Sequence, residues 1–237
     1  MSDWLDRTNL LLGPEKLQQL KNASVLVVGL GGVGAYAAEM ICRAGVGKIT
    51  IADSDLVEVS NRNRQLAALI STTGQPKTEI IGNRLLDINP ELELRVVNEF
   101  IRDEKAIELF KSQSFDYVID AIDTLAPKVF LIHHSLNLGL KLVSSMGAGG
   151  KIDPSKVAVT DISKSYNCKL ARMIRKRLNK LGINKGFKVV FSPEEVNENA
   201  VRIEEGQNKK SSVGTISYMP AVFGCFAASV VIRDLAE

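Results

Sequence analysis

A short buried strand that runs straight into a glycine-rich turn constrains the fold of this chain more than any other feature. Residues 24–34 read SVLVVGLGGVG, and residues 35–45 continue as AYAAEMICRAG. The apolar run is typical of a strand buried on both faces of a parallel sheet, and the segment after the turn has the pattern of a helix. The sequence therefore predicts a strand–turn–helix unit whose turn contains Gly29, Gly31, Gly32 and Gly34.

The spacing of these glycines is the G-x-G-x-x-G pattern of turns that bind nucleotide phosphates. Gly29 permits the tight bend, Gly31 lets a phosphate approach the backbone, and Gly34 lets the helix pack against the sheet. Phosphate oxygens would face the unpaired N–H groups of the helix N-terminus. Asp53 ends the next predicted strand about 20 residues later, the offset of an acid that binds ribose hydroxyls. The pattern predicts a nucleotide site but leaves the nucleotide open.

Strands and helices alternate up to about residue 150. This predicts an α/β fold, a doubly wound, Rossmann-like, mostly parallel sheet with helices on both faces. In this first part we expect a helix from about Asn63 and no regular element over residues 7–13. Residues 151–237 are a C-terminal extension with additional strands. There we expect a strand-like segment at 151–163, a basic helix that ends at Gly182, a mobile loop at 194–213, and a helix from Met219 to Ile232 that packs on the core.

The composition is typical of a soluble globular protein, with 45% hydrophobic and 24% charged residues among 237. We expect a cytoplasmic protein with no membrane contact, since no apolar run is long enough to span a bilayer and the N-terminus lacks the shape of a signal peptide. The three cysteines lie far apart, which favours free thiols and excludes a cysteine-based zinc site. We expect Cys42 and Cys225 in the core, Cys168 as a surface thiol, and His133 and His134 in structural roles.

The positive charge is concentrated in one stretch. Residues 164–188 contain nine Lys and Arg and no Asp or Glu, although the net charge of the whole chain is only +3. Such a segment can be an ordinary solvated helix face, but its asymmetry favours a polyanionic partner and predicts contacts with an RNA backbone. The candidate RNA-binding residues are Lys164, Lys169, Arg172, Arg175, Lys176, Arg177 and Lys180.

Polar residues beyond the ribose-binding strand bear on which nucleotide is bound. A glycine turn alone is typical of NAD or NADP enzymes, but Asn61, Arg64 and Gln65 form a cluster that suits a triphosphate better. Lys77 opens the next helix, where a second cation could reach phosphate. Asp123 lies just past the end of a strand, at the edge where open α/β sheets bind ligands, and could hold Mg²⁺ with phosphate oxygens.

The acidic residues near this edge also have plainer interpretations. Asp120 and Asp123 could be solvated acids at a strand end; we favour a function for Asp123 and none for Asp120. Asp55 either caps a turn or takes part in binding the nucleotide.

The complete series of motifs resembles a known family. GxGGxG is followed by Asp53 and Asp55, by S-N-x-x-R-Q at 60–65, by Lys77, and by D-A-I-D at 120–123. Over roughly residues 7–150 this series resembles the ATP-dependent adenylating fold shared by ubiquitin-activating enzymes and the bacterial activators of thiamine and molybdopterin biosynthesis. The resemblance implies that 1–237 is one adenylation domain, with a nucleotide-binding half at 1–150 and a substrate-binding half at 151–237.

The resemblance also implies roles for individual residues. Gly31, Gly32 and Gly34 would line the phosphates and Asp53 would bind the ribose. The triphosphate would be held by Asn61, Arg64, Gln65 and Lys77, with magnesium at Asp123. Family members form homodimers in which an N-terminal arginine reaches the neighbour's ATP, and Arg7 is the only arginine before the first strand.

The residues after about 150 narrow the choice among the subfamilies. The paired C-x-x-C motifs of the thiamine and molybdopterin activators are absent, and GAGGKIDPSKVAVTDISKS before a basic helix is similar to the tRNA threonylcarbamoyladenosine dehydratases. This implies an enzyme that adenylates the threonyl carboxylate of a modified adenosine beside the anticodon and then closes it to a cyclic ester. One departure is Cys168-Lys169, where that subfamily usually has Asp-Pro.

Two other functions remain open from the sequence. The same adenylation could activate the C-terminal glycine of a ubiquitin-like sulfur-carrier protein, and a sulfur-relay protein could be a partner. A nicotinamide-binding oxidoreductase or redox sensor is the third possibility, because the glycine turn alone is compatible with it.

Overall fold

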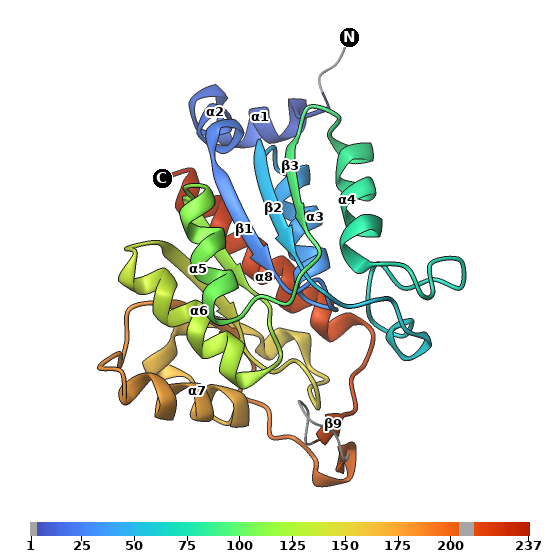
Figure 1. Cartoon of the computed structure of the whole chain (residues 1–237), viewed down its shortest axis with the longest axis vertical. Helices are drawn as coiled ribbons and strands as arrows, with labels where there is room; N and C mark the ends of the chain where they lie inside the picture. The colour runs from blue at the N-terminus through green and yellow to red at the C-terminus, as the bar shows by residue number, and fades with distance from the viewer. Residues whose placement is uncertain (1–3, 204–210) are drawn as a thin grey trace.

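The computed structural model describes residues 4–203 and 211–237, and a seven-stranded sheet forms its centre (Figure 1). The strand order is β3-β2-β1-β4-β5-β7-β6, in which β6 alone pairs antiparallel. The strands are β1 (Ser24–Val28), β2 (Lys48–Ala52), β3 (Glu93–Val97), β4 (Tyr117–Asp120), β5 (Lys141–Ser145), β6 (Ala158–Asp161) and β7 (Lys188–Phe191). The prediction of a doubly wound, mostly parallel α/β fold is confirmed.

Helices cover both faces of this sheet. Helices α3, α4 and α8 pack on one face and enclose one hydrophobic core, while α5, α6 and α7 enclose a second core on the other. The helices are α1 (Asp6–Leu12), α2 (Pro14–Asn22), α3 (Gly34–Arg43), α4 (Lys77–Ile88), α5 (Asp103–Ser112), α6 (Leu125–Asn137), α7 (Lys169–Asn179) and α8 (Tyr218–Leu235). Every residue of β1 is buried, as the apolar run predicts for a strand covered on both sides.

Short 3-10 turns and a separate two-stranded ribbon complete the chain. The turns are η1 (Val59–Asn61), η2 (Pro154–Lys156), η3 (Ile162–Lys164) and η4 (Glu198–Ala200). The ribbon pairs β8 (Val201–Ile203) with β9 (Ser211–Val213) in antiparallel fashion. The expected loop at 194–213 therefore contains regular structure, and its residues 204–210 lie outside the described part of the chain.

Three expectations about elements are wrong. Residues 6–12 form α1, although this segment carries no pattern that predicts a helix. No helix begins at Asn63: residues 62–73 form turns, in which the Thr72 hydroxyl donates to the Ala67 carbonyl and accepts from the Leu69 N–H. A side chain that satisfies backbone groups in this way competes with a helix. Only Ala158–Asp161 of the segment 151–163 is a strand.

The C-terminal elements follow the predictions more closely. The basic helix α7 ends at Asn179, and Gly182, with φ of 79°, closes the turn behind it. The terminal helix α8 is the one helix in the described chain that is long and apolar enough to cross a membrane. Its Met219, Phe223 and Ala227 are fully buried in the core against α3 and β5, so its apolar character serves packing within the fold.

The cysteine predictions are partly wrong. Cys42 is fully buried in α3, and burial raises the pKa of its thiol to about 11. Cys225 is exposed on α8, because the outer side of this helix is not covered. Cys168 is buried rather than on the surface: its Sγ accepts from the Ala171 N–H at 3.5 Å and caps α7.

Candidate nucleotide and RNA site

The glycine turn lies between β1 and α3, at the point where the strand order reverses between β1 and β4. Gly29 has φ of 91°, and a Cβ on it would stand 2.8 Å from the Ala121 carbonyl oxygen. A Cβ on Gly34 would stand 1.7 Å from the Gly29 carbonyl oxygen, so no side chain fits there. The atom nearest to a Cβ on Gly31 would be Gln65 Nε2 at 3.8 Å, which leaves this stretch of backbone open to a ligand. Gly32 instead packs against Pro220 of α8.

Asp53 follows β2 and faces this turn. Its Oδ2 accepts from the Leu30 N–H at 2.5 Å and its Oδ1 from the Asp55 N–H at 2.7 Å. Burial raises the pKa of Asp53, an effect that the charge of Lys77 and the two N–H groups partly offset. The carboxylate is thus fixed beside the glycine turn, as a ribose-binding acid would be.

Lys77 is the buried cation of the site. Its side chain is 5% exposed, and Nζ donates to Asp55 Oδ2 at 2.8 Å, whereas the Asp55 side chain is 65% exposed. The two residues also share a backbone bond, from the Lys77 N–H to the Asp55 carbonyl. Asp55 therefore orients the ammonium group of Lys77.

The residues of the predicted phosphate cluster, in η1 and just after it, have different roles. Asn61 is buried, and its Oδ1 accepts from the Glu58 N–H at 3.1 Å, so it holds the turn in shape. Arg64 is half-buried and donates to the Ser60 carbonyl and to Asn63 Oδ1. The Gln65 side chain lies beside Gly31, and its buried Oε1 has no hydrogen-bond partner within the described residues.

The two acids at the end of β4 and just beyond it also differ from each other. Asp123 is exposed in the turn that follows the strand. Asp120 is fully buried and pairs with Lys128 at 2.9 Å, so its interpretation as a solvated acid is wrong. Across the part of the chain that the structure describes, no group of three or more His, Cys, Asp and Glu residues could hold a metal by itself.

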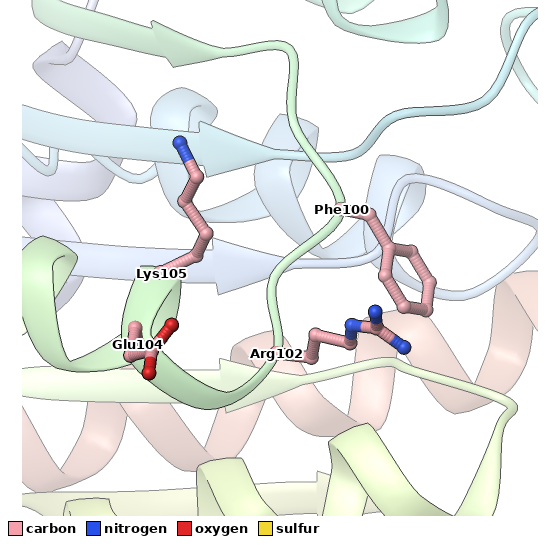
Figure 2. Close-up of a pocket in the computed structure, with 4 residues that line it drawn as sticks. All are labelled: Phe100, Arg102, Glu104 and Lys105. Atoms are coloured by element: carbon pink, nitrogen blue, oxygen red, sulfur yellow. The ribbon is translucent and has the colours of Figure 1, made fainter.

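Sequence reasoning missed a pocket of about 400 Å³ beyond β3 (Figure 2). It is lined by Phe100, Arg102, Glu104 and Lys105. Figure 2 shows Phe100 and Arg102 extending past the ends of the strands, and the Arg102 guanidinium lies 6.0 Å from the centroid of the Phe100 ring. The Asp53 N–H donates to the Val97 carbonyl at the end of β3, three residues before Phe100, so the chain that lines the pocket leaves β3 beside Asp53. An aromatic residue and a cation directly after a strand are the signal that could have found it.

Arg7 lies away from the glycine turn of its own chain. It is exposed on α1, and α1 lies at the opposite edge of the sheet, near the start of β1 (Figure 1). The preceding Leu5 packs where a Cβ on Gly45 would be, just before β2 begins. A strand of this length separates the two edges by about 16 Å.

The basic residues lie mostly on one exposed side of α7. Arg172, Met173, Lys176, Arg177 and Lys180 line a hollow of about 490 Å³ together with Leu125 of α6, here called the α6–α7 groove. Lys164 and Lys169 are also exposed. Arg175 differs, because its guanidinium donates to the carbonyl and hydroxyl of Ser165. Leu125 stands two residues after Asp123, so the groove adjoins the nucleotide edge.

A hydrogen bond joins the C-terminal half to the phosphate cluster. Asn63 Nδ2 donates to the Thr215 carbonyl at 2.9 Å, while Asn63 Oδ1 accepts from Arg64. The segment after β9 therefore lies against the loop that carries Arg64.

The chain is similar in sequence and in fold to known proteins. The model of the ThiF family matches residues 5–237. The tRNA threonylcarbamoyladenosine dehydratase of Bacillus subtilis (strain 168) is 41% identical, over 98% of this chain and 94% of its own length. The structure of E. coli tRNA N6-threonylcarbamoyladenosine dehydratase in complex with ATP is 36% identical, with a TM-score of 0.88 over 97% of this chain and 92% of that one. The same E. coli enzyme in complex with AMP has a TM-score of 0.87 at the same identity and coverage.

Proposed function

This chain belongs to the ThiF family, and we propose that it is an ATP-dependent dehydratase that cyclises threonylcarbamoyladenosine in tRNA. The observation that carries the proposal is the convergence of three features at one sheet edge. They are the open backbone at Gly31, the fixed carboxylate of Asp53 and the buried ammonium of Lys77. Together they suit the phosphates and ribose of ATP.

The chemistry follows from the poor electrophilicity of a carboxylate. A threonyl carboxylate oxygen attacks the α-phosphorus of ATP and pyrophosphate leaves. The carbamoyl oxygen then attacks the activated acyl carbon, AMP leaves with one of the original carboxylate oxygens, and the carbamoyl nitrogen releases a proton. The sum removes the elements of water from the nucleoside at the expense of ATP.

The protein contributes position and positive charge. The Arg64 carbonyl lies close to Gly32, and the charge of Lys77 acts on Asp53. Both side chains would stabilise the charge that develops on the phosphates during pyrophosphate release. One such donor, correctly placed, contributes about 10²–10³-fold in rate. No cysteine nucleophile is required, in keeping with the structural position of Cys168 at the start of α7.

Magnesium suits this donor set as a partner of the bound nucleotide. Asp123 offers a single exposed carboxylate at the strand edge, and Mg²⁺ is commonly held by one or two carboxylates together with phosphate oxygens and water. Asp123 would hold the ion, and Asp53 and Lys77 would bind the nucleotide beside it. Bound there, the ion would neutralise phosphate charge.

The tRNA would bind along α7. The α6–α7 groove presents cations to the phosphate backbone, and Leu125 and Met173 offer apolar contact for a base. Since Leu125 adjoins Asp123, RNA in the groove would bring its modified adenosine to the ATP. We place this reaction in the cytoplasm.

A homodimer would complete the site. Arg7 is too far from the glycine turn of its own protomer to act there, so it would reach the ATP of a partner copy. Exposed apolar residues beside it, Leu10 at 85% and Leu11 at 83% exposure, fit an interface with that copy.

Purified protein tests the proposal directly. With ATP, magnesium and tRNA that carries threonylcarbamoyladenosine, the nucleoside should lose one water while AMP and pyrophosphate form in equal amounts. With ¹⁸O in the threonyl carboxylate, the label should appear in AMP. The Lys77→Ala variant is the matched control, and nucleoside from cells lacking the protein should be heavier by one water.

The two other candidate functions predict different results in exchange and binding assays. Pyrophosphate exchange that needs a sulfur-carrier protein instead of tRNA would favour the activator of such a protein. Tight binding of NADH together with indifference to ATP would contradict the proposal.

A further inference from the structure

A fully buried ion pair lies beneath the nucleotide edge. The side chains of Asp120, the last residue of β4, and Lys128, in the second turn of α6, are both 0% exposed, and Nζ lies 2.9 Å from Oδ2. Neither residue can touch ATP or RNA directly, and the reaction described above uses neither.

The ammonium group of Lys128 also binds the turn between them. Nζ donates to the Ile122 carbonyl at 2.9 Å and to the Asp120 carbonyl at 3.4 Å, so that all three of its donors are used. Asp120 completes the arrangement, because its Oδ1 accepts from the Ile122 N–H at 3.1 Å and its Oδ2 from the Ser144 hydroxyl at 2.6 Å. Both the backbone N–H and the backbone carbonyl of Ile122 are therefore hydrogen-bonded to buried side chains.

The opposite side of the turn contacts the glycine turn. The Ala121 N–H donates to the Val28 carbonyl at 2.9 Å, and the Ala121 carbonyl fills the space that a Cβ on Gly29 would need. The next residue after Ile122 is Asp123. The backbone that leads to Asp123 is thus held by the Lys128 and Asp120 side chains on one side and by the contacts of Ala121 on the other.

Stability alone is a weak reason for such a pair. Removing two charges from water costs several kcal/mol per ion, and apolar residues of similar volume are often as stable or more so. A buried lysine whose donors all bind one turn is better suited to fixing the path of the backbone.

We propose that Lys128 is a positioning residue that holds the Asp120–Ile122 turn, and through it Asp123, in register with the phosphate-binding glycine turn. The inference rests on the proposed role of Asp123 at the magnesium ion. It concerns how the site is built, and assigns no contact between Lys128 and the substrates.

Lys128→Met is the first variant, because it keeps the length of the side chain and removes its charge and donors. A second variant, Asp120→Asn with Lys128→Met, removes both charges and so relieves the unpaired carboxylate that the single variant leaves in the core. Melting temperature, kcat and KM for ATP and tRNA are measured for each. The affinity for a non-hydrolysable ATP analogue is measured with and without magnesium.

If Lys128 is a positioning residue, the double variant should recover the melting temperature that Lys128→Met loses, but it should not recover kcat. A displacement of Asp123 by about 1 Å should cost about 10²-fold in kcat, with the KM for tRNA unchanged. Both variants should lose most of the gain in analogue affinity that magnesium gives the wild type, and Lys128→Arg should recover part of it.

A merely structural lysine would behave differently. Recovery of kcat together with melting temperature in the double variant would overturn the inference, as would wild-type magnesium dependence in either variant. The Asp123→Ala variant tests the proposed role of Asp123 separately from the inference about Lys128. If it leaves kcat unchanged, the proposed role of Asp123 fails, whereas a loss with Asp123→Ala and none with Lys128→Met overturns only the inference about Lys128.

Discussion

Lys77 and Asp55 form an ion pair of 2.8 Å in which the cation is buried and the anion is exposed. The asymmetry matters because water can solvate Asp55 when the pair is broken but cannot easily reach Lys77. The pair therefore leaves the ammonium group dependent on an anion at the mouth of the site, and ATP is the anion that we propose takes this place.

Substitution of Asp55 should mainly lower stability, whereas substitution of Lys77 should mainly lower activity. Asp55→Ala leaves a buried ammonium without its carboxylate and should cost about 1–3 kcal/mol in free energy of unfolding. ATP should raise the melting temperature of this variant more than that of the wild type. Lys77→Met leaves an exposed carboxylate and should change stability little, while pyrophosphate exchange falls by about 10²-fold or more. Melting curves with and without ATP check the effects on stability, and a pyrophosphate exchange assay checks the effect on activity. The reverse order would contradict the prediction.

Binding of ATP should weaken in acid at a higher pH than an ordinary aspartate would cause. Burial raises the pKa of Asp53 above its usual 3.8, and in the proposed site the ionised form would accept hydrogen bonds from ribose hydroxyls. Affinity should therefore be lost as the pH falls through this raised pKa. The same shift lowers native stability as the pH rises from 3.8 to the raised pKa, since the unfolded state ionises first. Titration of a non-hydrolysable ATP analogue between about pH 4 and 7 tests the binding. Asp53→Asn is the control and should remove this part of the pH dependence.

If Arg7 acts on a partner's ATP, two inactive variants should complement each other. Arg7→Ala and Lys77→Ala should each lose activity as homodimers. Mixed after exchange of subunits, they should recover about one quarter of wild-type activity, because half of the dimers then contain one complete site. Dehydration of modified tRNA is the measurement. Activity of Arg7→Ala alone at the wild-type level would remove this arginine from the site.

The charges along the α6–α7 groove should set the salt dependence of tRNA binding. Lys176→Ala and Lys180→Ala should each reduce the slope of log K against log salt by about 0.7 to 1. Lys16→Ala, exposed on α2, is the matched control and should leave the slope unchanged. Arg175→Ala should lower the melting temperature with little effect on the slope, because its guanidinium is engaged by Ser165. Equal slopes for all four variants would show that α7 does not bind the RNA backbone.

The elements around the glycine turn were predictable from the sequence because their signals are local. The glycine turn, the strand that ends before Asp53 and the helix that begins at Lys77 are each encoded within a few residues. Backbone sterics then leave little freedom, as the contact between Gly34 and Gly29 illustrates. The C-terminal helices α7 and α8 are found for the same reason.

The errors arise where a partner distant in sequence decides the outcome. Asp120 looks like a solvated acid until Lys128 and Ser144 are brought beneath it from α6 and β5. A lysine within the apolar run APKVFLIHH was the available signal. Likewise, the Thr72 hydroxyl stabilises a compact turn where a helix was expected from Asn63. The hydrophobic periodicity of the sequence does not indicate this turn.

The pairing of β5 with β7 has a consequence for how the proposed tRNA substrate would bind. Because Val143–Ser145 pairs directly with Lys188–Val190, the sheet runs without interruption from the nucleotide strands into the C-terminal half. A hinge motion between these halves would have to break the backbone hydrogen bonds between β5 and β7, in the interior of the sheet. On the proposed function, the two halves would keep a fixed arrangement, and the RNA loop would have to turn its modified base outward for the carboxylate to reach the ATP.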